Sequence, residues 1–125
     1  MRFLSMIRIN ENSGMVPSEK LMSDMGKLIE EMTRAGTLVS TAGLRPTSEG
    51  VRVRFSRGKV STIDGPFAET KEVIGGYAIL EAKSKAEAIE LTKRFLLIHG
   101  EEWDIECEVR QLDDPDCGAA RNAAA

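Results

Sequence analysis

The chain has 125 residues, of which 42% are hydrophobic and 30% are charged, and its formal net charge is −3. This size and composition are typical of one globular domain that folds without disulfide or metal staples. The slightly acidic balance excludes the basic surface of a typical nucleic-acid-binding protein. No segment approaches the ~18 consecutive apolar residues of a membrane span, and the N-terminal apolar run is too short for a signal peptide. We therefore expect a cytoplasmic protein that contacts neither nucleic acid nor membrane.

The first third of the chain predicts a strand, a helix and a second strand. Residues 3–9 carry apolar side chains on both faces, which is typical of a central strand. A helix is expected to begin at Pro17 or Ser18 and to end at Gly36, because glycine readily takes the left-handed conformation beyond a helix C-terminus. Residues 37–44 follow as a strand.

The middle of the chain predicts a β-hairpin and a long strand. Residues 51–55 alternate apolar and basic side chains, which favours a half-buried strand, and residues 60–63 return as its partner. Residues 73–82 form a further strand with apolar side chains on both faces. Its Gly75-Gly76 pair indicates a bulge or a close approach of another backbone.

The last third predicts a second helix and a final strand. Ser84 and Glu87 fit a capping box at the start of residues 84–100. Glu90 and Arg94 have the spacing of an ion pair on that helix. Residues 105–110 alternate as a strand in which Cys107 is a small buried hydrophobe. We expect one domain over residues 1–112 and a disordered tail over 113–125.

The order of elements is β-α-β, hairpin, β-α-β, which predicts an α+β, ferredoxin-like fold with an antiparallel sheet and both helices on one face. The opposite face of such a sheet is open. The strands predicted over residues 3–9 and 73–82 nevertheless carry apolar groups on both faces. An exposed apolar sheet would aggregate. A second copy of the chain is the simplest cover, so we expect a homodimer.

One stretch concentrates potential chemistry between two strands, namely Asp64-Gly65-Pro66-Phe67-Ala68-Glu69-Thr70-Lys71-Glu72. Asp64 is a candidate general acid or base if burial against Phe67 moves its pKa towards neutrality. The alternative is a structural turn, because Asp-Gly is a favoured turn pair.

The other candidate ligand-binding residues could also have purely structural or solvent-exposed roles. Glu69 and Lys71 share strand parity and could contact a ligand or pair with each other in solvent. Arg54 could bind an anion or belong to a solvated face. His99, the single histidine, could be a ligand-binding group or could cap the end of its helix. One histidine and no Cys-x-x-Cys exclude the common zinc arrangements, and no phosphate-binding loop is present, so no cofactor is expected.

The segment 64–72, followed by Gly75-Gly76-Tyr77, resembles the signature of the DGPF-domain branch of the YCII-related protein family, and weaker similarity extends over residues 1–112. The resemblance implies a dimeric α/β barrel of two ferredoxin-like units, with a pocket between sheet and helices near the motif. It also implies a bacterial protein, in a regulatory context near extracytoplasmic-function sigma factors. An acid and a histidine have been proposed to act in the wider superfamily, but Met25 stands where the plain YCII branch carries that histidine.

Two main functions follow as hypotheses. The first is a cofactor-independent small-molecule enzyme in which Asp64 is the acid or base, and Phe67, Lys71 and an arginine position a small anionic or aromatic ligand. The second is a ligand-binding or regulatory module without turnover. A dimeric interaction protein without a pocket ligand is a third. The missing histidine partner for Asp64 favours binding over catalysis.

Overall fold

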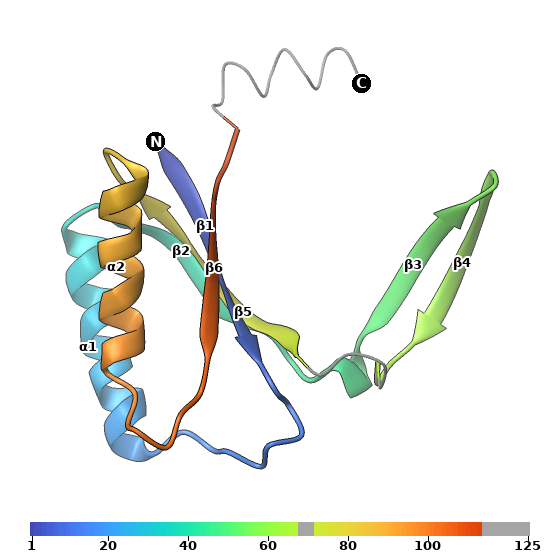
Figure 1. Cartoon of the computed structure of the whole chain (residues 1–125), viewed down its shortest axis with the longest axis horizontal. Helices are drawn as coiled ribbons and strands as arrows, with labels where there is room; N and C mark the ends of the chain where they lie inside the picture. Colours follow the sequence, from blue (N-terminus) through green and yellow to red (C-terminus); the bar gives the residue numbers. More distant parts are fainter. Residues whose placement is uncertain (68–71, 114–125) are drawn as a thin grey trace.

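The computed structural model describes residues 1–67 and 72–113. Four strands form one antiparallel sheet in the order β2-β5-β1-β6: β1 (Arg2–Ile9), β2 (Leu38–Gly43), β5 (Val73–Glu81) and β6 (Glu106–Gln111). Helices α1 (Glu19–Arg34) and α2 (Lys85–Leu97) cover one face of this sheet (Figure 1). After a short 3-10 turn, η1 (Thr47–Glu49), strands β3 (Val51–Ser56) and β4 (Lys59–Asp64) form a separate ribbon, the arm.

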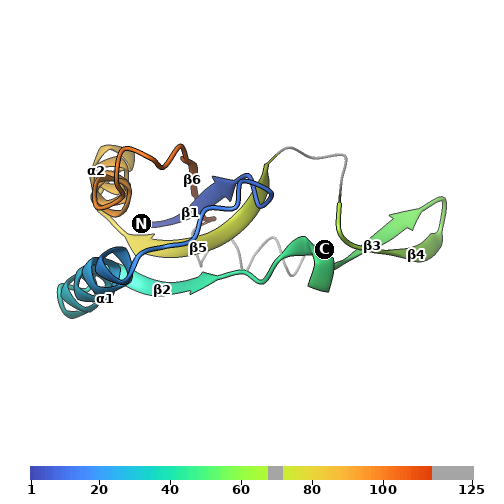
Figure 2. The ribbon, with the colours of Figure 1, turned by 90° about the horizontal axis from the view of Figure 1, so that it is seen from below.

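The α+β class and the antiparallel sheet are confirmed. The strand order is consistent with a ferredoxin-like fold, in which β1 is central and the arm is an insertion between β2 and β5. Figures 1 and 2 both show the helices on one side of the sheet and the arm on the other. Of the tail expected over residues 113–125, residues 114–125 lie outside the described residues.

The helix ends follow the capping signals in the sequence. Ser18 accepts a hydrogen bond from the Leu21 amide at 3.1 Å, and Gly36 follows α1 with a φ of 77°. Ser84 likewise accepts from the Glu87 amide at 3.1 Å and begins α2. These caps satisfy backbone groups that have no partner within the helix.

The expected ion pair between Glu90 and Arg94 is not formed. Arg94 donates instead to Glu31 of α1 at 2.9 Å, and Glu90 accepts from Lys93 at 3.0 Å. Spacing along one helix does not reveal how closely a second helix packs, so tertiary packing decides the partner. The Arg94–Glu31 pair joins the two helices at their solvent-exposed side.

The core lies between the helices and the sheet. Phe3 of β1, Met32 of α1 and Leu80 of β5 are its fully buried large side chains. Burying each such side chain contributes about 1.5–3 kcal/mol relative to leaving it in water. This layer fixes the helices on the sheet and so determines where cavities can form beside them.

The opposite face of the sheet is uncovered in the described chain. Leu4, Met6, Tyr77 and Ile79 lie there, since their neighbours in β1 and β5 point to the helices, and they are half-buried. We call these four residues the open sheet face.

The arm differs from expectation. The sequence predicts a half-buried strand over residues 51–55, yet Val53 is 67% exposed and Phe55 is 74% exposed. The ribbon leaves the four-stranded sheet, so no second layer lies against it in the described chain.

The bulge expected at Gly75-Gly76 is confirmed. Ile7 pairs with Gly76 and Arg8 pairs with Ile74, so Gly75 is the extra residue of β5. Its carbonyl accepts a hydrogen bond from the Leu44 amide at 2.9 Å. The bulge therefore connects the end of β2 to the beginning of β5.

Gly26→Ala is expected to raise the free energy of unfolding by about 1 kcal/mol, because alanine is the better helix former by that amount. Gly26 is exposed within α1, and a Cβ there meets nothing within 4 Å. Urea unfolding measures the change. A loss of stability would contradict this placement of Gly26.

Candidate functional site

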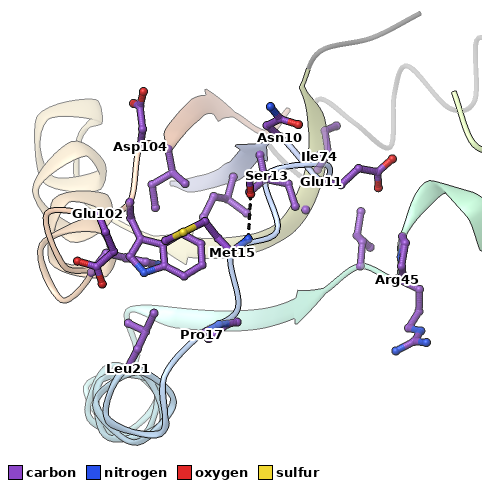
Figure 3. Close-up of a pocket in the computed structure, with 18 residues that line it drawn as sticks. Asn10, Glu11, Ser13, Met15, Pro17, Leu21, Arg45, Ile74, Glu102 and Asp104 are labelled. Carbon is purple, nitrogen blue, oxygen red and sulfur yellow. Dashed lines mark hydrogen bonds between the residues drawn. The ribbon is translucent and has the colours of Figure 1, made fainter. Parts of the chain in front are cut away.

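A cavity of about 560 Å³ lies at one end of the sheet (Figure 3). Three loops build its wall: the loop after β1, the segment after β2, and the loop between α2 and β6. They meet because β1 and β2 end at the same end of the sheet, and β6, which is antiparallel to β1, begins there. Figure 3 shows Glu102 and Asp104 on one side of the cavity and Glu11 and Arg45 on the other.

A second cavity of about 440 Å³ lies between the helices and the sheet. Its helical wall is apolar and consists of Met22, Met25 and Ile29 of α1 with Phe95 and Leu96 of α2. The two cavities share Ile7, Gly75 and His99 in their walls, so they are neighbours.

His99 lies between the two cavities with its tautomer fixed by the backbone. Its Nδ1 is 3.0 Å from the Phe95 carbonyl oxygen and 3.2 Å from that of Leu96. Carbonyl oxygens only accept, so Nδ1 carries the proton and donates, and neutral His99 keeps Nε2 as its acceptor. The ring also makes an edge-to-face contact with Trp103, with 5.5 Å between centroids. The expected helix-capping role is thus present, and the same side chain lines both cavities.

The charged groups of the larger cavity are mostly carboxylates. Glu11, Glu102 and Asp104 contribute three acids to its wall. Arg45 is held by Glu49, whose oxygens accept from it at 2.9 and 3.2 Å, and this hydrogen bond raises the pKa of Arg45. The wall therefore favours a neutral or cationic ligand over an anionic one.

Glu11 also ties the cavity wall to η1. Its carboxylate accepts from the Thr47 amide at 3.0 Å and from the Thr47 hydroxyl. The hydroxyl bond is the main reason, and the amide bond the second, why the pKa of Glu11 lies below its ordinary value. Both bonds favour the charged form.

The segment that begins at Asp64 also contacts η1 and the residue that follows it. The Gly65 amide donates to the Gly50 carbonyl at 2.9 Å. A Cβ on Gly65 would stand 1.7 Å from the Thr47 carbonyl oxygen, so only glycine permits this approach. The motif is thus linked through Thr47 to Glu11 and to the cavity wall.

The remaining sequence-derived candidates are spread over the arm and its base. Asp64 is the exposed last residue of β4, opposite Val51, and is not among the residues lining either cavity. Phe67 lies under the Arg52 guanidinium, 3.9 Å from the ring centroid. Arg54 is exposed on the arm. Glu69 and Lys71 lie outside the described residues.

Sequence reasoning found His99 but missed Glu11 and Trp103 as cavity residues. The available signal was topological, because loops at the same end of adjacent strands converge. Cys107 lines the smaller cavity; burial raises the pKa of its thiol, and a hydrogen bond with Ser5 lowers it in part.

Within residues 1–67 and 72–113, no three side chains among His, Cys, Asp and Glu gather as a metal-binding group. No described helix has the length and apolar character needed to cross a membrane.

Thr47→Val is expected to raise the pKa of Glu11 towards its ordinary value of 4.5, because the hydroxyl donor is lost while the amide donor stays. In the wild type the stabilisation is present above pH 4.5 and is lost as the pH falls through the lower folded-state pKa. NMR titration of the Glu11 carboxyl measures the change. An unchanged titration would show that the hydroxyl does not hold Glu11.

Gly65→Ala is expected to lower the free energy of unfolding by about 1–3 kcal/mol, since the added methyl group collides with a backbone oxygen that cannot rotate away. Chemical denaturation measures this, with Gly26→Ala as the matched glycine control in open space. Equal stability of Gly65→Ala and wild type would refute the close approach to Thr47.

Comparison with known proteins places the chain among its relatives. Residues 1–98 match the YCII-related domain. An uncharacterised protein of Rhizobium meliloti (strain 1021) is 35% identical over 75 residues, which cover 60% of this chain and 60% of that protein. The alignment thus spans less than two thirds of the relative. The family match covers most of the described strands and helices, and the chain belongs to the YCII-related domain family.

Proposed function

We propose that this protein binds a small molecule with an apolar, aromatic-sized body that is neutral or cationic, in the two cavities beside His99. The observation that carries the proposal is the shared position of His99, between a cavity with an apolar helical wall and one with an acidic wall. Small-molecule sites are typically of this kind, with apolar walls and few polar groups that orient the ligand.

The cavity sizes support a ligand of modest dimensions. Volumes of about 440 and 560 Å³ fall within the range of roughly 300–1,000 Å³ that ligand pockets occupy. An apolar ligand body fits against Met25, Ile29 and Phe95, and a donor group on the ligand fits the Nε2 acceptor of His99. The acidic wall argues against the anionic ligand expected from the sequence.

Binding without turnover is the preferred form of the proposal. Catalysis by a general acid or base requires its carboxyl within hydrogen-bond reach of the substrate. Asp64 lines neither cavity of the single chain, so an acid or base role for it needs a site completed by another element. Catalysis by Asp64 is therefore the second candidate, favoured only by its link through Thr47 to the cavity wall. A regulatory role near sigma factors would accord with binding alone.

We also propose a homodimer of barrel type. The open sheet face supports it, because four half-buried apolar side chains on an uncovered sheet are typical of an interface. A second copy offers the same apolar surface in return.

A thermal-shift screen tests the binding proposal with matched sets of neutral, cationic and anionic aromatic compounds. Neutral or cationic members are expected to raise the melting temperature of the wild type. His99→Asn is expected to reduce that shift, because the asparagine amide can still donate to the Phe95 carbonyl while Nε2 is lost. Retention of the full shift in His99→Asn would contradict the role of Nε2.

Asp64→Asn in the same screen separates the two candidate functions. Its shift is expected to equal that of the wild type, since Asp64 lines neither cavity. Loss of the shift only in Asp64→Asn would instead favour a site at the motif. If no compound shifts any variant, the binding proposal fails.

Thiol labelling gives an independent measurement in a Cys117→Ser background. A stabilising compound is expected to slow alkylation of Cys107 several-fold, because this thiol lines the smaller cavity. A compound that raises the melting temperature without slowing alkylation binds elsewhere.

A further inference from the structure

The arm has two chemically distinct faces. Residues that pair across antiparallel strands point to the same side. Val51, Val53 and Phe55, with Val60 opposite Phe55, therefore share one face with Thr62 and Asp64, and we call it the apolar face. Arg52, Arg54 and Lys59 lie on the other, basic face, where Ile63 is opposite Arg52.

The apolar face is exposed along its whole length. Its four apolar side chains are 52%, 67%, 74% and 67% exposed, in the order Val51, Val53, Phe55 and Val60. An isolated two-stranded ribbon is marginally stable in water at best. A row of large apolar side chains on such a ribbon indicates a surface that another molecule covers.

We propose that the apolar face of the arm docks onto a second copy of this chain. The inference rests on the homodimer proposed above and adds to it the element through which each protomer holds the other. If the ribbon is stable only when another molecule packs on its apolar face, that molecule must be present wherever the chain is made. A second copy of the chain meets this requirement.

Charge complementarity supports the same occupant. Residues 51–64 carry four basic side chains and one acidic side chain, whereas the rest of the chain carries thirteen basic and nineteen acidic ones. The sequence of the arm is thus net positive and the remaining sequence net negative, which favours the encounter of one arm with the body of a second copy. The basic side chains lie on the face opposite Val53 and Phe55, so they act on this encounter and not at the apolar contact.

The placement of the arm is also suitable. It projects on the side of the sheet that the helices leave uncovered (Figures 1 and 2). The two incompletely covered apolar surfaces, the arm face and the open sheet face, are therefore both available to a molecule approaching from that side. In a two-fold pair, each arm that contacts the partner implies a second, equivalent contact.

Sedimentation equilibrium of the wild type and of Val53→Thr/Phe55→Thr tests the inference. Threonine keeps a high strand propensity but removes apolar surface, so the ribbon can still form. The dimer dissociation constant is expected to rise at least ten-fold in the double variant. Ser61→Thr, on the opposite face of the arm, is the control and is expected to leave the constant unchanged.

The outcomes separate this inference from the proposals on which it rests. A wild-type protein that is monomeric at high micromolar concentration would overturn both the homodimer and the docking of the arm. A wild-type dimer whose constant is unchanged in the double variant would overturn the arm contact and leave the homodimer standing. Failure of ligand binding beside His99 would alter neither result.

Hydrogen exchange gives a readout that does not depend on variants. Amides of residues 51–64 are expected to exchange at least ten-fold more slowly in the dimer than in the diluted monomer. Equal exchange rates in both states would overturn the docking of the arm onto a second copy. A different protein would then be the candidate partner for the apolar face.

Discussion

The packing of two helices against one face of a four-stranded sheet is the constraint on which the rest of the structure depends. Phe3, Met32 and Leu80 are the largest fully buried side chains between these layers. Closer to the end of the sheet where the loops meet, the side chains become smaller or are absent, as at Gly75 and Gly76. The two cavities lie at this end, and Gly75 lines both of them.

The arm is separate from the four-stranded sheet. Both helices cover one face of that sheet, and its edge strands, β2 and β6, do not pair with β3 or β4. A ribbon inserted between β2 and β5 must then leave the sheet. Its base is held by backbone hydrogen bonds from Gly65 to Gly50 and from Gly50 to Thr47. The arm and the cavity wall are therefore anchored at one shared point, although they face different surroundings.

Local signals predicted the elements well because their causes are local. Ser18, Gly36 and Ser84 act on backbone groups within a few residues, and the structure places each as expected. The partner of Arg94 and the exposure of Phe55 depend on how distant elements pack, and spacing along the chain carries no information about that. For the candidate site, the sequence drew attention to His99 and to a glycine-containing bulge. Glu11 and Trp103 line the same cavity because the strand topology brings their loops together, which the local sequence does not reveal.

The residue at position 75 influences the size of both cavities. A methyl group at this position would stand 2.6 Å from Cδ1, 2.8 Å from Cγ1 and 3.3 Å from Cγ2 of Ile9, whereas at Gly76 it would stand 3.0 Å from the backbone oxygen of Ala42. Position 75 therefore accepts a side chain only if the Ile9 side chain moves, while at position 76 the obstacle is backbone. Gly75 lines both cavities, so a larger residue there would narrow them from the sheet side without touching the buried core. Relatives with the same fold could in this way diverge in ligand size by exchanging one residue.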